Sequence, residues 1–308
     1  MSRDPFHAGE VTVQERTGER ARAILNSRGI GHLIPPRARP FVAEQQYCVI
    51  ASLSPAGRVQ ASFVGGERGF ASSDTEGSSL TLRLPAHAVE TLAAPLPGLQ
   101  PGGQVGVLFI ELTTRRRLRV NGRIADATAD TVRVQVEEAF PNCPKYIQRR
   151  EAVAVTPRVD PPAQAERGTT LTPAVIEWIR SADTFFVASA HPQGRVDVSH
   201  RGGEPGFVKV EGRRLWVPDY PGNSMFGTLG NFAVNPRAAL VFPDFAGHRQ
   251  LQVWGEVGLA LDGGEERGAT GGTGRWWSLT AGEWAVSPLT PALQWTLIDR
   301  SPLNPPAS

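Results

Sequence analysis

The chain contains the stretch ASLSPAGRVQASFVGGERGF at residues 51–70 and repeats it as ASAHPQGRVDVSHRGGEPGF at residues 188–207. The two copies are identical at 12 of 20 positions and lie at a constant offset of 137 (207 − 70). Solenoid repeats have much shorter periods, so this spacing indicates a duplicated domain rather than a repeat array.

The duplication continues downstream, where residues 105–124 align with residues 238–257 at an offset of 133 (257 − 124). At 308 residues, the chain has the length of two ordinary domains. Proline and polar residues are concentrated between the copies, as in many linkers. We therefore predict an N-terminal domain over residues 1–155, a linker over residues 156–170 and a C-terminal domain over residues 171–308.

Each copy is predicted to be mainly β, with a few short helices. In the second copy, short apolar or alternating runs predict strands at residues 185–189, 196–199, 215–217, 238–242 and 250–257. Thr172 before Pro173 predicts a helix start, and further helices are expected at residues 18–27, 38–46 and 132–140. About six short strands per copy favour a closed barrel, which leaves no sheet edge open.

Composition excludes several classes of protein. With 32 basic and 30 acidic residues, the net charge of +2 argues against a nucleic-acid partner or an anionic membrane surface. The arginine-rich residues 115–123 alternate with apolar ones, which predicts a strand with a solvated face. No apolar run is long enough to span a membrane, and the N-terminus lacks a signal-peptide pattern. Two cysteines and six scattered histidines predict neither a disulfide framework nor a metal site, so we expect a cytoplasmic protein.

One motif occurs only in the second copy and predicts an anion site. Asp219-Tyr-Pro-Gly-Asn-Ser-Met225 is turn-forming and precedes a short predicted helix that begins near Gly227. Unpaired amides and the dipole at a helix N-terminus favour phosphate, and Asn223 and Ser224 add side-chain donors. The alternative is a capped turn, but the absence of this motif from the first copy favours a function.

A second motif, Asn142-Cys-Pro-Lys-Tyr146, occurs only in the first copy. It offers a thiol, an ammonium group and a phenol to one pocket, but no nearby histidine to activate the cysteine as a nucleophile. A simple loop is the alternative. In the second copy, Arg249 and Gln250 form a plausible pair for a phosphate and a ring carbonyl. The tryptophans late in the chain, Trp276, Trp277, Trp284 and Trp295, are expected to pack at a domain seam, with stacking on a cofactor as the alternative.

Together, these motifs resemble the flavin-nucleotide-binding proteins related to pyridoxamine 5′-phosphate oxidase. The resemblance is carried by residues 201–207, 218–226, 229–231, 235–236, 249–250 and 142–146. It implies two tandem six-stranded split β-barrels with FMN at the interface between barrels. By this resemblance, the cofactor-binding residues are Ser199, Arg201, Tyr220, Asn223, Ser224, Met225, Asn231, Arg249, Gln250, Cys143, Lys145 and Tyr146.

The two copies depart from the family pattern in complementary ways, which suggests one composite FMN site. Asn223 and Ser224, with Arg201, would hold the phosphate, Arg249 and Gln250 would lie nearer the ribityl chain and the ring, and residues 143–146 would approach the ring from the other barrel. Asn223, Ser224 and Met225 replace basic residues expected in the loop of the name-giving enzyme, so its own activity is not predicted.

The resemblance thus implies an FMN-dependent oxidoreductase with a small-molecule substrate of unspecified identity and NAD(P)H as a candidate electron donor. No catalytic residue is assigned, and a homodimer is compatible with the family. One alternative is a flavin-binding carrier, sensor or subunit without turnover. Another is a haem-binding or haem-degrading split barrel, with His200 or His248 as the axial ligand, and deazaflavin is a further candidate cofactor.

Overall fold

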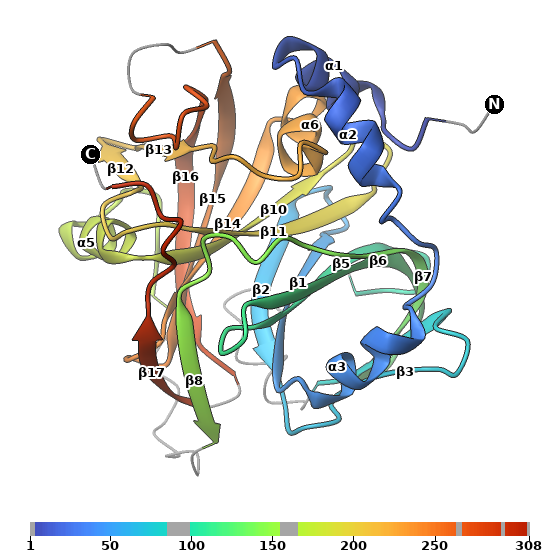
Figure 1. Cartoon of the computed structure of the whole chain (residues 1–308). Helices are drawn as coiled ribbons and strands as arrows, with labels where there is room; N and C mark the ends of the chain where they lie inside the picture. The colour runs from blue at the N-terminus through green and yellow to red at the C-terminus, as the bar shows by residue number, and fades with distance from the viewer. Residues whose placement is uncertain (1–3, 85–98, 155–165, 263–266, 291–292, 307–308) are drawn as a thin grey trace.

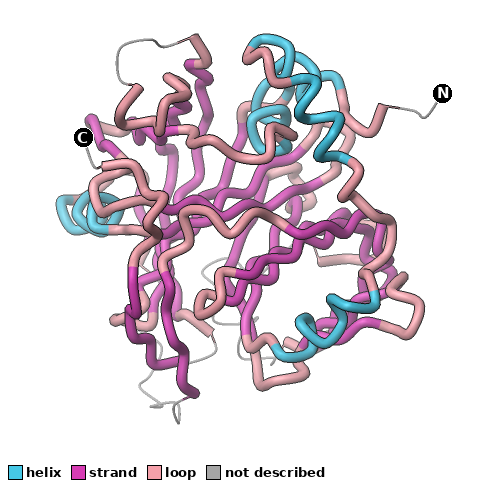
Figure 2. The backbone as a smooth tube through the Cα atoms, viewed as in Figure 1, coloured by secondary structure: helices cyan, strands magenta, loops and turns pink. Residues whose placement is uncertain are grey.

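We describe the fold from a computed structural model, which covers residues 4–84, 99–154, 166–262, 267–290 and 293–306. Residues 156–165, which are most of the predicted linker, lie outside the described residues. Strands dominate, and the helices are short (Figures 1 and 2). No helix among the described residues is long and apolar enough to cross a membrane.

The first barrel is a sheet of seven antiparallel strands in the order β2-β1-β5-β6-β7-β4-β3. Its seventh strand, β3, has only three residues. The strands are β1 (Tyr47–Leu53), β2 (Val59–Gly65), β3 (Ala71–Ser73), β4 (Ser79–Arg83), β5 (Gln104–Glu111), β6 (Arg116–Ala127) and β7 (Thr131–Pro141).

The second barrel follows the same path, β11-β10-β14-β15-β16-β13-β12, with each strand in the position of its counterpart. The identical topology confirms the duplication inferred from the sequence. The strands are β10 (Thr184–Ala190), β11 (Val196–Gly202), β12 (Lys209–Glu211), β13 (Arg214–Pro218), β14 (Arg237–Asp244), β15 (Arg249–Ala260) and β16 (Trp276–Pro288), and β9 (Arg167–Gly168) pairs with β16.

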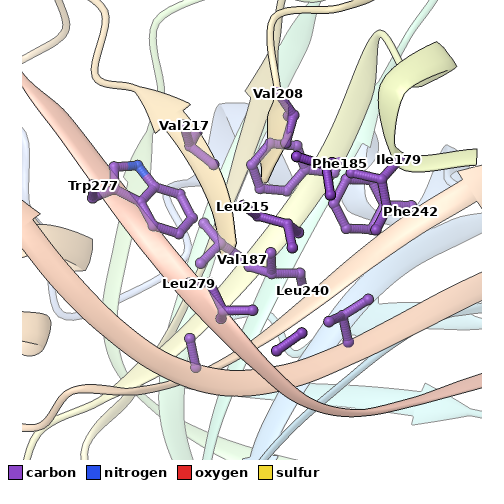
Figure 3. Close-up of a cluster of buried hydrophobic side chains, with 14 of the residues drawn as sticks. Ile179, Phe185, Val187, Val208, Leu215, Val217, Leu240, Phe242, Trp277 and Leu279 are labelled. Atoms are coloured by element: carbon purple, nitrogen blue, oxygen red, sulfur yellow. The ribbon is translucent and has the colours of Figure 1, made fainter. Parts of the chain in front are cut away.

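Alternation along the strands builds three cores rather than two. On β10, Phe185 and Val187 point into the second barrel (Figure 3), whereas Phe186 and Ala188 belong to a separate cluster between the barrels. The equivalent strand β1 divides its side chains in the same way. Because successive residues of a strand face opposite sides, these strands are buried on both faces. We call the cluster between the barrels the seam.

A two-stranded sheet also links the two halves of the chain. β8 (Arg149–Ala154) follows the first barrel, β17 (Leu293–Asp299) follows the second, and the two strands pair antiparallel. They run side by side in Figure 1. Trp295 of β17 lies in the seam, as predicted, but the same prediction is wrong for Trp277 and Trp284, which pack in the core of the second barrel.

Helices occupy the ends of the barrels. The predicted start at Thr172 is confirmed, because its side chain accepts a hydrogen bond from the Val175 amide at the beginning of α5 (Pro173–Ser181). The predicted helix at residues 132–140 is wrong, because these residues form β7. Valines at every second position there fit a strand with one buried face. The remaining helices are α1 (Ala8–Arg16), α2 (Arg20–Ser27), η1 (Pro36–Ala38), α3 (Arg39–Glu44) and α6 (Gly227–Val234).

The N-terminal helices cross over to the second barrel, where α1 lies against α6 (Figure 1). Two glycines make this crossing close. A Cβ atom added to Gly9 would lie 2.2 Å from the carbonyl oxygen of Gly230, and one added to Gly230 would lie 2.6 Å from the Cα of Glu10. Side chains at these positions would therefore separate the helices.

We expect Gly230→Ala to loosen α1 from α6 and to destabilise the protein by about 1–3 kcal/mol, the usual cost of overpacking. The helix propensity of alanine favours the variant by only about 1 kcal/mol, so the clash decides the sign. Urea unfolding and hydrogen exchange of the α1 amides measure the effect. Gly268→Ala is the control, because nothing lies within 4 Å of its added Cβ. Equal stability of both variants would contradict the prediction.

Candidate functional site

A pocket opens at the seam, and residues from both halves of the chain line it; we call it the seam pocket. Ten of the twelve predicted cofactor residues line it. From the second copy these are Ser199, Arg201, Tyr220, Asn223, Ser224, Met225 and Asn231, and from the first copy Cys143, Lys145 and Tyr146. The structure thus brings together the two motifs that each occur in one copy only.

The loop before α6 forms one wall of the seam pocket. The Asn223 side chain accepts a hydrogen bond from the Met225 amide at 3.1 Å. Ser224 and Phe226 both have positive φ angles, 64° and 60°, so the chain turns sharply into the helix. From the first copy, the Tyr146 hydroxyl donates to the Pro221 carbonyl at 3.1 Å, which fixes the two motifs against each other.

The floor of the pocket includes two arginines of β6, a strand of the first barrel. Arg119 forms an ion pair with Asp197 at 3.0 Å and donates to the Ser199 hydroxyl at 2.6 Å. Ser199 in turn shares a hydrogen bond with Thr228 of α6 at 2.8 Å. Arg117 donates to the Cys143 carbonyl oxygen. Burial and the neighbouring Arg119 lower the pKa of Arg117 to about 9, which leaves it charged at neutral pH.

The predicted solvated face of this strand is therefore wrong. Leu118 and Val120 do face the first barrel, as alternation requires, but Arg117 and Arg119 face the pocket instead of water. Alternation along a strand shows which side chains share a face, but it does not show what packs against that face.

A second charged group lies beside the loop. Arg201 pairs with Asp219 at 3.0 Å, and Arg275 pairs with the other oxygen of Asp219 at 2.9 Å. Arg275 also forms an ion pair with Glu19, and the two side chains are 2.5 Å apart. Glu19 lies between α1 and α2 in the sequence. Glu19 further accepts a hydrogen bond from the Ser224 hydroxyl.

Several buried polar atoms of the pocket have no hydrogen-bond partner among the described residues. They are the Nε atoms of Arg117, Arg119 and Arg201, the Nε2 atom of His200 and the Oδ1 atoms of Asn121 and Asn142. The lining residues include six basic side chains (Arg117, Arg119, Lys145, Arg195, Arg201, Arg275) and five acidic ones (Glu10, Glu19, Glu138, Asp197, Asp219). Unpaired buried donors and a cationic excess fit a ligand that carries acceptors and negative charge.

The remaining two predicted residues lie elsewhere. Arg249 pairs with Asp244 at 3.2 Å and sits over the ring of Trp178, outside the seam pocket. Gln250 is buried in the seam, where its amide accepts from the Phe63 amide at 2.9 Å and donates to the Phe63 carbonyl at 3.1 Å.

These contacts show how the duplication has diverged. By the 133-residue offset, Gln250 and Gln252 are the counterparts of Arg117 and Arg119. Gln252 donates to the Ser62 hydroxyl at 2.8 Å, just as Arg119 donates to Ser199, the counterpart of Ser62. Around Gln250, the Phe63 side chain packs in the seam core. The Phe63 backbone forms hydrogen bonds with both polar atoms of the Gln250 side chain. The contact between β6 and β11 therefore forms the pocket floor, whereas the equivalent contact between β15 and β2 is a packed interface.

One end of the pocket holds a half-buried acid and a half-buried histidine. The Glu10 side chain accepts a hydrogen bond from the His7 amide at 2.9 Å, and His7 in turn caps α1. Burial raises the pKa of Glu10 to about 7, with Asp197 and Glu138 acting in the same direction. Burial lowers the pKa of His7 to about 4.

We expect the stability of the Glu10→Gln variant to depend on pH more strongly than that of the native protein, in which two opposite effects partly cancel. Folding raises the pKa of Glu10 from 4.5 to about 7, so its contribution to stability falls as pH rises through that window. Folding lowers the pKa of His7 from 6.5 to about 4, so its contribution rises with pH up to about 6.5. The two contributions therefore change with pH in opposite directions, and replacing Glu10 by glutamine removes only the contribution of Glu10.

Relative to the native protein, the Glu10→Gln variant should therefore gain up to about 3 kcal/mol between pH 4.5 and pH 7. Urea unfolding across this range measures the difference. Parallel stability curves for the two proteins would contradict the assignment of a shifted pKa to Glu10.

Sequence reasoning missed the residues that approach the pocket from outside the motifs. Arg117 and Arg119 were recognised only as part of a strand, and Glu10, Glu19 and Arg275 were not singled out. The one available signal was the alignment of Arg117 and Arg119 with the polar pair Gln250 and Gln252, on strands where both copies keep polar residues between apolar ones.

The match to a protein family agrees with the fold of the second barrel. Residues 171–283, which run from α5 into β16, match the family described as pyridoxamine 5′-phosphate oxidase. The first half of the chain has the same strand order as the second, so it has the same architecture. A comparison with curated proteins found no match.

Solved structures with similarity to parts of this chain include three proteins. A protein related to general stress protein 26, of the pyridoxinephosphate oxidase family, from Clostridium acetobutylicum is 14% identical, with a TM-score of 0.29, covering 40% of this chain and 90% of that one. An FAD-binding protein from Mesorhizobium loti is 10% identical (TM-score 0.28; 40% and 97%). HutZ, the heme storage protein from Vibrio cholerae, is 15% identical (TM-score 0.25; 42% and 94%).

Proposed function

Because its second barrel is a pyridoxamine 5′-phosphate oxidase-like split barrel, we propose that the chain binds one FMN in the seam pocket and acts as an FMN-dependent oxidoreductase. Asn223, Ser224 and Arg201 would hold the phosphate, and Cys143, Lys145 and Tyr146 would flank the flavin from the first copy. When bound, FMN supplies hydride or electron transfer, while the protein binds and orients the reactants.

The observation that carries this proposal is the joining of two single-copy motifs in one cationic pocket. The loop at residues 219–226 and the segment at residues 142–146 lie far apart in sequence and meet through the Tyr146–Pro221 hydrogen bond. Unpaired Nε atoms of Arg117, Arg119 and Arg201 add buried donors around them. A flavin nucleotide offers an anionic phosphate, a polar ribityl chain and ring carbonyls to such a set.

The test is a titration of purified protein with FMN, followed by the visible flavin absorption bands and by quantifying flavin per chain. We expect one FMN per chain, and loss of binding when Asn223 and Ser224 are both replaced by alanine. Two flavins per chain, or unchanged binding in the double variant, would contradict the composite site.

Turnover separates an enzyme from a flavin carrier or sensor. An oxidoreductase loaded with FMN should oxidise NADH or NADPH at steady state in the presence of an electron acceptor. A holo-protein that binds FMN tightly but consumes neither nucleotide under any acceptor tested would favour the non-catalytic alternative.

His200 favours haem as a second candidate ligand. It lines the seam pocket, its Nε2 has no partner among the described residues, and burial lowers its pKa, which keeps the imidazole neutral as a metal ligand requires. His248, the other sequence candidate, lies on an exposed turn away from the pocket. A shifted Soret band on adding haemin, lost in His200→Phe, would support this alternative.

A further inference from the structure

Glu19 belongs to the N-terminal part of the chain, yet its carboxylate sits among the residues proposed to hold the FMN phosphate. One oxygen contacts Arg275 at 2.5 Å, and the other accepts from the Ser224 hydroxyl. Ser224 is buried in the loop before α6, and Asn223 accepts from Asn26 of α2 through its carbonyl at 2.6 Å. The first copy thus places an acid directly on the loop that is specific to the second.

The charges around Glu19 explain why an anion lies there. Arg201 and Arg275 share Asp219, so two positive charges face one negative charge without Glu19, and Glu19 completes the balance. A phosphate group can accept the same hydrogen bonds from arginine and serine as a carboxylate does. Both anions cannot occupy these donors together, because like charges at contact distance repel strongly when shielded from water.

The surroundings of Glu19 allow it to leave while α1 stays docked. Glu19 immediately precedes α2 and follows Gly18, whose φ of 69° marks a turn between the two helices. The α1 helix is held by the close glycine crossing with α6 and by Gln14, which donates to the Met225 carbonyl at 2.9 Å. In contrast, α2 buries only Ala23 among its residues and is otherwise held by polar contacts, of Arg20 with Gln14 and of Asn26 with the Asn223 carbonyl.

We propose that Glu19 is an internal competitor for the phosphate and thereby determines which flavin the pocket accepts. In this inference, which rests on the proposed function, a phosphorylated flavin must displace the Glu19 carboxylate from Arg275 and Ser224. A flavin without phosphate leaves Glu19 in place. The residue therefore weakens the binding of FMN without affecting the binding of riboflavin, and it couples cofactor binding to the position of α2.

The first test compares Glu19→Gln with Glu15→Gln in the full-length protein. Glutamine keeps the shape of Glu19 and removes its charge, whereas Glu15 is an exposed acid of α1 whose replacement makes the same change in net charge. Dissociation constants for FMN and riboflavin are measured by calorimetry. We expect Glu19→Gln to tighten FMN at least about tenfold, equivalent to about 1.4 kcal/mol, and to change riboflavin less than twofold. Equal effects on the two flavins, or no gain for FMN, would overturn the inference.

A second probe separates this inference from the proposed function. Inorganic phosphate alone should raise the melting temperature of Glu19→Gln more than that of the native protein or Glu15→Gln. If this gain appears while neither flavin binds any variant, the anion subsite stands and the flavin proposal fails. If phosphate stabilises all three proteins equally, Glu19 does not compete for the subsite, whether or not FMN binds.

Discussion

Replacing Arg117 and Arg119 together with glutamine is expected to weaken FMN binding by about 100-fold, although no residue of the second copy is changed. Each arginine offers the pocket a buried charged donor, and a hydrogen bond to a charged group contributes about 1.5–3 kcal/mol. Loss of two such bonds amounts to about 3 kcal/mol or more, which corresponds to a factor of about 100.

Glutamine is the informative replacement because the chain already uses it at the equivalent positions. Gln250 and Gln252 reach Phe63 and Ser62 across the packed side of the seam, so the same side chains can satisfy their neighbours without a positive charge. The variant leaves Asp197 without its ion-pair partner, so its circular dichroism is compared with that of the native protein before its FMN affinity is measured by calorimetry.

The matched control replaces Arg116 and Arg123, which lie on the same strand. Their side chains are 55% and 54% exposed and pair with Glu111 and Glu137 at the surface. We expect the control to bind FMN as the native protein does. If the Arg117 and Arg119 variant also keeps native affinity, these two arginines take no part in FMN binding.

The sequence predicted the architecture because duplication is a long-range signal that needs no structural knowledge. The 137-residue offset between the hairpins of β1–β2 and β10–β11 is visible in the residues themselves. The motif residues could also be found, since turn chemistry at Tyr220–Ser224 and the segment at residues 142–146 are local features. That they share one pocket followed from the complementarity of the two copies.

The sequence could not predict what lies opposite each motif. Arg117 and Arg119 alternate with core residues as solvated side chains would, and only the second barrel packed against β6 turns their face into a pocket floor. Glu19 and Glu10 reach the site because α1 crosses from the first copy to α6, a tertiary contact with no local signal beyond Gly9 and Gly230. Gln250 lies on the closed side of the seam, where it contacts Phe63, and Arg249 faces the other way, toward Asp244 and Trp178.

Breaking the ion pair between Arg150 and Asp183 is expected to destabilise the protein by about 3–5 kcal/mol, the usual cost of leaving one buried charge unpaired. The Arg150 and Asp183 side chains are 10% and 8% exposed and meet at 2.6 Å. Arg150 also lies over the ring of Phe245, 4.3 Å from its centroid. In Arg150→Ala, the Asp183 carboxylate would remain in the seam without its partner.

This ion pair joins β8, which leaves the first barrel, to the start of β10 in the second, so its loss should also reach the pocket. Urea unfolding of Arg150→Ala gives the loss of stability. Arg16→Ala, which breaks an exposed pair with Asp262 (48% and 74% exposed), should change it by less than about 1 kcal/mol. If Arg150→Ala costs no more than Arg16→Ala, this ion pair contributes nothing to holding the barrels together. A large cost, accompanied by weaker FMN binding in the folded variant, would tie the composite pocket to the docking of the barrels, because neither Arg150 nor Asp183 lines it.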